Sequence, residues 1–381
     1  MDRIDGDVAP GFAPVRDAFA ANFRERGEVG AAVCVYHRGR PVVDLWGGIA
    51  DPATQRPWNR DTLVLVYSMT KGVSATCAHL LVERGQLDLD APVARYWPEF
   101  AARGKSSIPV RWILAHRAGL AVIEGDMTRE ETLAWLPVVE ALAAQAPNWE
   151  PGTKHGYHLR SYGWLVGELT RRIDGRTIGR FFAEEIAARI GLEFWIGLPE
   201  SEEPRLAVLV PPPPEFHAML ASLPPEVLLN RATTGPSGHF AYDARWNERA
   251  LHACELPSSN GIGTARSLAR LYASLIGEVD GIRTLRPETI ANATKVESQG
   301  IDAVLMRETT FGLGFMLPPT LVPGTGPHAF GHGGAGGSVA FADPDHDLAF
   351  TYAMNHLRFD PRGDPRSESL VRATYAAVAA F

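Results

Sequence analysis

The hydrophobic positions near the start of the chain predict a helix followed by a β-hairpin. Four apolar residues recur at helical spacing within residues 12–26, so this stretch is expected to form an amphipathic helix. Apolar and β-branched residues then dominate 30–37 and 41–46, and the short turn 38–40 separates these two runs. Two such runs around a tight, glycine-containing turn are typical of a β-hairpin.

Helical patterns dominate the middle of the chain, and strand patterns return near its end. Residues 69–85 are expected to form a second helix, which Gly85 ends as a C-cap. The four consecutive prolines in 210–214 predict a stiff, extended linker. Further helices are expected at 129–145, 161–174, 177–190, 263–276, 286–293 and 365–380, and strands at 311–317, 338–342 and 348–353.

This order of elements, with strands at both ends and helices between them, determines the expected fold class. Strands near the two termini most simply meet in one antiparallel sheet. We therefore expect an α+β fold, in which an antiparallel sheet is flanked by the terminal helices and accompanied by a mainly helical second lobe. Residues 1–88 and 255–381 are assigned to the sheet lobe, and residues 89–254 to the helical lobe. A cleft between two such lobes is the usual place for a binding site.

Composition and charge exclude several classes of partner and site. The 381 residues carry a net charge of −7, so nothing favours nucleic acid or an anionic membrane as a partner. The cysteines, Cys34, Cys77 and Cys254, are too few and too scattered to predict a disulfide framework or a zinc site. No metal or other cofactor is expected. The sequence shows neither a signal peptide nor an apolar run long enough to span a membrane, which predicts a cytoplasmic protein.

Ser68 and Lys71, at the start of the second predicted helix, are the first candidates for chemistry. Residues three apart lie on one helical face, with Cβ atoms about 5–6 Å apart. A lysine can act as the base for a serine nucleophile when burial and the positive end of a helix dipole destabilise its ammonium form. The backbone N–H of Ser68 can also serve as half of an oxyanion hole. The alternative is a solvated helix start with a serine cap, but the apolar run 62–66 before it indicates a buried junction.

Longer motifs around this pair resemble the superfamily of class C β-lactamases and penicillin-binding proteins. Ser68-Met-Thr-Lys71 is followed by the matching segments Leu80–Asp90 and Ile113–Leu120, and the similarity extends over residues 28 to 355 or so. The family VIII carboxylesterases, the esterase branch of this superfamily, are the most similar. The resemblance implies a β-lactamase/transpeptidase-like fold and an acyl-enzyme formed on Ser68.

The resemblance also implies a catalytic tyrosine. Tyr157 matches the position of the family's tyrosine, whose phenol would share protons with the serine and with the leaving alcohol. Without the family match, Tyr157 would be interpreted as a core residue with a satisfied hydroxyl group, and Tyr162 is the second candidate. Residue 159 is leucine where β-lactamases usually carry asparagine. This difference argues against β-lactamase activity and fits the esterase branch.

A glycine-rich run at 331–337 matches the third motif of the family, which here reads His332-Gly333-Gly334. Glycines let a substrate approach the neighbouring backbone closely. The resemblance places the second oxyanion donor at the N–H of Ala335. The run also fits the pattern Gly-x-Gly-x-x-Gly of dinucleotide-binding proteins, but that pattern requires a following helix, and strand-like residues follow here.

Together these residues predict a serine hydrolase that cleaves short-chain carboxylic esters through an acyl-enzyme on Ser68. Lys71 and Tyr157 would move the proton, and either could be the base because the two groups titrate together. The alternatives are an acyltransferase that uses the same acyl-enzyme, a weak β-lactamase or D-amino-acid peptidase, and a non-catalytic scaffold. A small-molecule ester is the expected partner, and the sequence predicts no oligomeric state. The expected pocket residues are Met69, Trp149 and Asn260.

Overall fold

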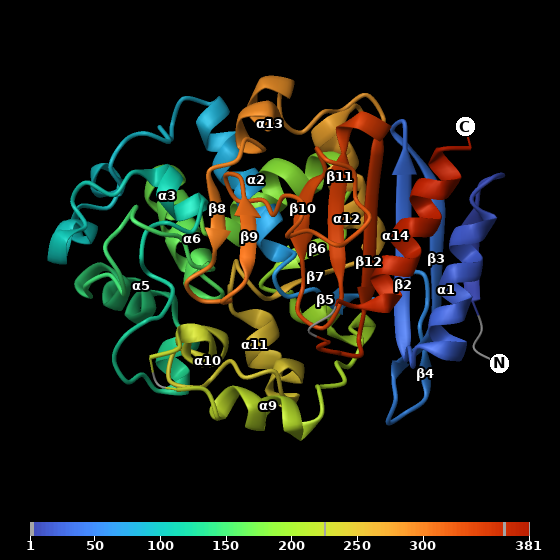
Figure 1. Cartoon of the computed structure of the whole chain (residues 1–381), viewed down its shortest axis with the longest axis horizontal. Coiled ribbons are helices and arrows are strands. Elements are labelled where there is room, and N and C mark those ends of the chain that lie inside the picture. Colours follow the sequence, from blue (N-terminus) through green and yellow to red (C-terminus); the bar gives the residue numbers. More distant parts are fainter. Residues whose placement is uncertain (1–3, 225, 361–362, 381) are drawn as a thin grey trace.

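A seven-stranded antiparallel sheet is the largest element of the structure, a computed structural model that describes residues 4–224, 226–360 and 363–380 (Figure 1). Its strands are β1 (Ile4–Val8), β2 (Gly30–His37), β3 (Arg40–Asp51), β4 (Arg56–Pro57), β10 (Phe330–Gly333), β11 (Val339–Asp343) and β12 (Leu348–Met354). They follow the order β1-β3-β2-β12-β11-β10, with β4 paired to β3. Because β2 pairs with β12, the two ends of the chain meet in the middle of the sheet. This confirms the expected α+β fold and the hairpin formed by β2 and β3.

Helices cover both faces of this sheet. The terminal helices α1 (Ala13–Glu25) and α14 (Pro365–Val378) pack against each other over one face, and α12 (Ala265–Ile276) packs on the other (Figure 1). The alternation of side chains along a strand accounts for this arrangement. In β2, Val33 and Val35 belong to the apolar cluster that contains the α1 residues, whereas Cys34 and Tyr36 belong to the cluster that contains the α12 residues.

The middle of the chain is mainly helical, as predicted, and two small sheets complete the fold. Strands β5, β7 and β6 form one small sheet in that order, and β8 and β9 form a hairpin. The boundaries of the two lobes stay a prediction. Within the described residues, no helix combines the length and the apolar character needed to cross a membrane. The helices are α2 (Thr70–Glu83), α3 (Val110–Leu114), α4 (Arg129–Leu133), α5 (Trp135–Ala144), α6 (Ser161–Asp174), α7 (Ile178–Phe182), α8 (Ala188–Ile190), α9 (Pro214–Ala221), α10 (Leu228–Thr234), α11 (Arg249–Ala253) and α13 (Pro287–Ala293). The strands are β5 (Val64–Leu65), β6 (Phe194–Ile196), β7 (Gly261–Gly263), β8 (Ser298–Ile301) and β9 (Glu308–Phe311).

The predicted helix 129–145 and the predicted strand 311–317 differ from the structure because of a proline and of glycines, respectively. The expected helix 129–145 is divided into α4 and α5 at Ala134, which has an extended conformation. Pro137 explains the break, because a proline is tolerated in the first turn of a helix but not in its interior. The expected strand 311–317 is wrong, because β9 ends at Phe311. The chain then turns at Gly312 and Gly314, and Gly314 has a φ of +91°.

Strand β10 was not predicted as a strand, because its sequence is half glycine. The run 331–337 was expected to precede a strand, but its first three residues belong to β10, which pairs with β11 at the edge of the sheet. The third motif therefore lies on an edge strand. Strand β1, at the opposite edge, was not predicted either.

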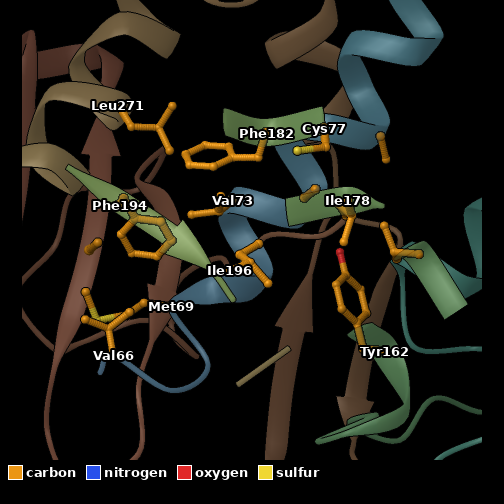
Figure 2. Close-up of a cluster of buried hydrophobic side chains, with 14 of the residues drawn as sticks. Val66, Met69, Val73, Cys77, Tyr162, Ile178, Phe182, Phe194, Ile196 and Leu271 are labelled. Atoms are coloured by element: carbon orange, nitrogen blue, oxygen red, sulfur yellow. The ribbon is translucent and has the colours of Figure 1, made fainter. Parts of the chain in front are cut away.

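Helix α2 lies at the centre of the molecule. Every residue from Thr70 to Leu81 is buried, so this helix has no solvent-facing stripe. In Figure 2, Val73 and Cys77 of α2 lie among apolar side chains such as Phe182 and Leu271, which come from other elements. The start of α2, where Ser68 and Lys71 lie, is consequently surrounded by protein.

Candidate active site

Ser68 lies in the tight connection between β5 and α2. The preceding residue, Tyr67, has a φ of +47°, a left-handed conformation that is unfavourable for a tyrosine. Its ring makes edge contacts with Tyr242 and Trp246, at centroid distances of 5.2 and 4.7 Å, which hold the residue in this conformation. The Lys71 N–H donates to the Ser68 carbonyl oxygen at 3.0 Å, so the serine belongs to the first helical turn. Ser68 is only 8% exposed.

The Lys71 amine is fully buried and has three oxygen neighbours. Its Nζ lies 3.3 Å from Ser68 Oγ, 2.7 Å from the Leu159 carbonyl oxygen and 3.0 Å from the Ser258 carbonyl oxygen. Burial lowers the pKa of Lys71 well below its usual value, and the nearby positive charge of Arg160 lowers it further. A neutral amine has two N–H groups and one lone pair. The two carbonyl oxygens can accept the two N–H groups, which leaves the lone pair for the serine hydroxyl.

The Tyr157 phenol completes a cluster with these two groups. Its hydroxyl group lies next to the Ser68 hydroxyl, and its ring centroid lies 4.8 Å from Lys71 Nζ. Its ring stacks on Phe311 at a centroid distance of 5.8 Å. Burial raises the pKa of Tyr157 well above its usual value, although the Ser68 hydroxyl, which could donate to a phenolate, opposes the shift. The phenol therefore keeps its proton at neutral pH. Tyr162, the second candidate, has no hydrogen-bond partner for its hydroxyl among the described residues.

Asp302 fixes the backbone of this tyrosine, although nothing in its local sequence marked it for that role. Both of its carboxylate oxygens accept the Tyr157 N–H at 3.0 Å. The carboxylate is fully buried and also accepts the N–H groups of Val304 and Leu305, each at 2.8 Å. Tyr157 and Asp302 are 145 residues apart in the chain, so only the folded structure reveals the contact.

His332 lies beside the Tyr157 phenol, and the two rings stack at a centroid distance of 5.8 Å. Its Nδ1 is 2.7 Å from the Gly333 carbonyl oxygen, which can only accept, so Nδ1 carries the hydrogen. Burial, followed by the charge of Lys71, lowers the pKa of His332 to about 3, so the ring is neutral. Its Nε2, 3.4 Å from the Tyr157 hydroxyl oxygen, is then an acceptor for the phenol. The ring is 1% exposed and offers no positive charge to a ligand.

The third motif approaches the serine closely. A Cβ atom on Gly334 would collide with the carbonyl oxygen of Val66, two residues before Ser68, so only glycine fits this position. The Gly334 N–H donates to the Ser338 carbonyl oxygen at 2.8 Å. Within the described part of the chain, the N–H groups of Ser68 and Ala335 donate to no protein acceptor. These are the two donors expected to form the oxyanion hole.

The three expected pocket residues have structural contacts. Met69 is fully buried beside Val66 and Phe194 in the apolar cluster of Figure 2. The Asn260 side chain is hydrogen-bonded to nearby backbone groups, including the carbonyl oxygens of Leu251 and Cys254. Trp149 is 8% exposed and packs edge-on against His158, next to Tyr157 in the chain. Both Met69 and Asn260 are fully buried, and the expectation that they line the pocket stays a prediction.

Arg160 is a second residue that the sequence did not indicate. It is 3% exposed, and its guanidinium donates to the carbonyl oxygens of Thr233 and Phe240, each at 3.0 Å, and to Ser259 Oγ at 2.9 Å. No carboxylate pairs with it among the described residues. Its own carbonyl oxygen accepts the Ser258 hydroxyl at 2.8 Å. Arg160 thus links the loop that ends at Phe240 to the segments that hold Lys71.

Two cavities of the described chain lie away from this cluster. One, of about 640 Å³, is lined by Gly27 and by residues of the segments 211–213 and 356–360. The other, of about 360 Å³, is lined by residues of the segment 97–102 and of helices α5 and α6. Neither is lined by Ser68, Lys71 or Tyr157. Among the described residues, no group of three or more histidine, cysteine or acidic side chains is arranged to hold a metal ion.

Comparison with known proteins places the chain in a family. The beta-lactamase family model matches residues 15–373. The chain is 37% identical to "Esterase/beta-lactamase LipL" of Mycobacterium tuberculosis, over 93% of this chain and 83% of that protein. Among solved structures, a family VIII carboxylesterase is 38% identical with a TM-score of 0.88, covering 98% of this chain and all of that one. EstA of Arthrobacter nitroguajacolicus is 35% identical with a TM-score of 0.87, covering 99% of both chains. The chain therefore belongs to the beta-lactamase family, and it is similar over nearly its whole length to the esterases within it.

Proposed function

We propose that this protein is a serine carboxylesterase that hydrolyses uncharged carboxylic esters through an acyl-enzyme on Ser68. The observation that supports this most directly is the buried contact of the Ser68 hydroxyl with both the Lys71 amine and the Tyr157 phenol. Similarity to esterases at 35–38% identity supports the same reaction. The cytoplasmic location expected from the sequence stays a prediction.

Lys71 acts as the base in the proposed mechanism. Its lowered pKa provides the neutral amine, and the carbonyl oxygens of Leu159 and Ser258 orient the lone pair toward Ser68 Oγ. As Oγ attacks the ester carbonyl carbon, the hydroxyl proton passes to Nζ. Tyr157 cannot be the base in this state because its phenol retains its proton.

The remaining steps use the phenol and the two free N–H groups. The N–H groups of Ser68 and Ala335 stabilise the oxyanion of the tetrahedral intermediate. The alkoxide leaves with the proton of Tyr157, and the proton on Lys71 then restores the phenol. Water then attacks the acyl carbon while one of its protons passes to Lys71, and Lys71 returns this proton to Ser68 Oγ as the bond from that oxygen to the acyl carbon breaks and the carboxylic acid is released.

The charges around the site limit the substrate class. His332 is neutral, and the Arg160 guanidinium is bound by two carbonyl oxygens and a hydroxyl group. Among the described residues that contact Ser68, Lys71 or Tyr157, none offers a free cation for a substrate carboxylate. We therefore expect neutral esters to react faster than esters with an acyl chain that ends in a carboxylate.

Product analysis with p-nitrophenyl butyrate in the presence of an added alcohol tests the proposed reaction. We expect free butyric acid as the main product, and slower turnover of p-nitrophenyl hemisuccinate, which carries a carboxylate. Butyrate esters of the added alcohol as the main product would instead identify an acyltransferase. No turnover of either substrate, together with no labelling by a fluorophosphonate, would identify a non-catalytic scaffold.

Hydrolysis of β-lactams is a second candidate, because the name of the M. tuberculosis relative includes this activity. In this chain a backbone carbonyl of Leu159 contacts Lys71, and no side-chain amide is present at position 159 to orient the amide of a β-lactam. We therefore expect nitrocefin to be cleaved far more slowly than p-nitrophenyl butyrate. Equal or faster cleavage of nitrocefin would favour the β-lactamase.

The pH dependence of kcat/KM should report the protonation of Lys71. Activity is lost as the pH falls through the pKa of this amine, because the ammonium has no lone pair. Arg160→Met removes the neighbouring positive charge, so the pKa of Lys71 rises and the acid limb of the profile moves to higher pH. Steady-state rates with p-nitrophenyl butyrate between acid and neutral pH measure this shift.

Arg160→Lys separates the charge of Arg160 from its hydrogen bonds. This variant keeps the charge but cannot reproduce the fork that binds Thr233 and Phe240. Its acid limb should stay near that of the parent enzyme while its melting temperature falls. An unchanged acid limb in Arg160→Met would show that the charge does not influence Lys71.

A further inference from the structure

The turn that carries the N–H of Ala335 has almost no side chains of its own to hold it. It runs from Gly334 to Gly337, between β10 and β11, and Gly336 and Gly337 have φ values of +84° and +115°. A hydrogen bond of 2.8 Å from the Gly334 N–H to the Ser338 carbonyl oxygen closes the turn, but the bond inside it, from the Gly337 N–H to the Gly334 carbonyl oxygen, is long at 3.4 Å. A glycine-rich turn of this kind has many accessible conformations, so other groups must fix it.

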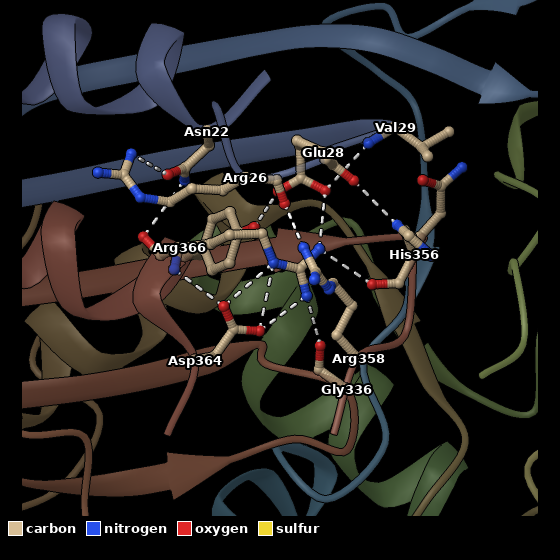
Figure 3. A network of polar contacts seen from close by, with 12 residues as sticks. Asn22, Arg26, Glu28, Val29, Gly336, His356, Arg358, Asp364 and Arg366 are labelled. Atoms are coloured by element: carbon tan, nitrogen blue, oxygen red, sulfur yellow. Dashed lines mark hydrogen bonds and ion pairs between the residues drawn. The ribbon is translucent and has the colours of Figure 1, made fainter. Parts of the chain in front are cut away.

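The groups that hold this turn come from helix α14 and from the segment between β12 and α14. Arg366, in the first turn of α14, donates from Nη2 to the Gly336 carbonyl oxygen at 2.8 Å, and the Arg358 N–H donates to the same oxygen at 3.2 Å. A Cβ atom on Gly337 would collide with the carboxylate of Asp364, so the turn rests directly on the start of α14. Figure 3 shows the Arg366 guanidinium between Gly336, Asp364 and Glu28.

Two acidic side chains hold the Arg366 guanidinium. Its Nη1 lies 3.1 Å from Glu28 Oε1, and its Nη2 lies 2.7 Å from Asp364 Oδ2. The side chains of Arg366 and Glu28 are fully buried, and the Tyr352 hydroxyl also donates to Glu28. Arg366 further donates to the His356 carbonyl oxygen at 3.1 Å. With several fixed partners, the guanidinium presents its remaining N–H group to Gly336 in one orientation.

We propose that Arg366 is a positioning residue for the oxyanion hole, which holds the glycine turn so that the Ala335 N–H points at the reacting carbonyl oxygen. The inference rests on the proposed function, because it takes this N–H to be an oxyanion donor. Arg366 contacts the turn at Gly336, one residue after the donor, and does not touch the substrate. Oxyanion donors stabilise the transition state more than the bound substrate, so a displaced turn should reduce kcat much more than it changes KM.

The double variant Glu28→Gln/Arg366→Met tests the proposal without leaving the fully buried Glu28 carboxylate unpaired. We expect kcat for p-nitrophenyl butyrate to fall by about 10- to 100-fold, the range for misplaced catalytic groups and lost oxyanion donors, with KM within about twofold. Rates are expressed per active site, counted by covalent labelling of Ser68 with a fluorophosphonate at completion. The inhibition constant of a trifluoromethyl ketone, whose adduct carries an oxyanion, should rise by the same factor as kcat/KM falls.

Two control variants separate positioning from stability. Tyr352→Phe removes the hydroxyl that donates to Glu28 but keeps the bond from Arg366 to Gly336, so the melting temperature should fall while kcat per labelled site is kept. Arg372→Met, on the exposed side of the same helix, should change neither. If the double variant is labelled and its kcat per site is unchanged, Arg366 has only a structural role. If the parent enzyme itself takes up no label on Ser68, the proposed function fails instead.

Discussion

Ser68→Ala is expected to lower kcat/KM for p-nitrophenyl butyrate on the order of 10⁴- to 10⁶-fold, as removal of a nucleophile does in other serine hydrolases. No other hydroxyl group in the described structure is within reach of both the Lys71 amine and the Tyr157 phenol. Deletion of one buried oxygen atom should leave the fold intact, so substrate binding should persist without an acyl-enzyme. Intact-protein mass spectrometry after fluorophosphonate treatment should find a covalent adduct on the parent enzyme and none on the variant.

Ser74→Ala is the matched control for this variant. Ser74 lies on the same buried helix, and its hydroxyl donates to the Pro257 carbonyl oxygen at 2.5 Å. Its loss should reduce stability by about 1–3 kcal/mol, the cost of an unsatisfied buried acceptor, but should keep both the adduct and the esterase activity. Full activity in Ser68→Ala would show that another group is the nucleophile.

Lys71→Met is expected to reduce kcat by roughly 10³- to 10⁴-fold, the contribution of a well-placed general base. Methionine fills a similar volume but has no lone pair that can take the Ser68 proton. Because an ester can still bind, KM should change far less than kcat. The release of p-nitrophenol in a rapid-mixing experiment should show a slow acylation phase with no initial burst. Activity that rises with pH in the variant would show that hydroxide partly replaces the missing amine.

Lys105→Met is the matched control for this second prediction. Lys105 is also fully buried, and its Nζ donates to the carbonyl oxygens of Ala102 and Ala143 at 2.9 and 3.0 Å. Lys105 is not among the residues that contact Ser68. Burial lowers the pKa of the Lys105 amine too, in this case to about 8. The variant should lose stability and keep its kcat. A large loss of kcat in Lys105→Met, or none in Lys71→Met, would contradict the assigned role of Lys71.

Local spacing and the family resemblance together predicted the groups that react in the proposed mechanism, but not the groups that hold them. Ser68 and Lys71 are one helical turn apart, so their spacing alone predicted that they meet. The contacts of Tyr157 with Asp302, and of Arg366 with Gly336, join residues 145 and 30 positions apart. No periodicity or spacing rule connects such pairs, because their encounter depends on the whole fold.

The fold was predicted well where side-chain periodicity was strong and poorly where glycine or short length removed it. The hairpin of β2 and β3 and the terminal helices have clear apolar patterns, and the structure confirms them. Glycines at 331 and 333 carry no side chains to alternate, so β10 was not recognised as a strand. The hydrogen bonds of the Asn260 side chain to its own loop could not be predicted either, because a loop asparagine that faces a ligand and one bound by its own loop look the same in sequence.

The place of β12 in the sheet has a consequence for biosynthesis. This strand is formed by residues 348–354, and it lies between β2 and β11, so the sheet stays open until these residues have left the ribosome. Strand β10 and the third motif can reach the α2 segment only after that late, non-local pairing, which is the slow kind of step in folding. A nascent chain should therefore carry Ser68 and Lys71 for most of its translation without being able to hydrolyse an ester.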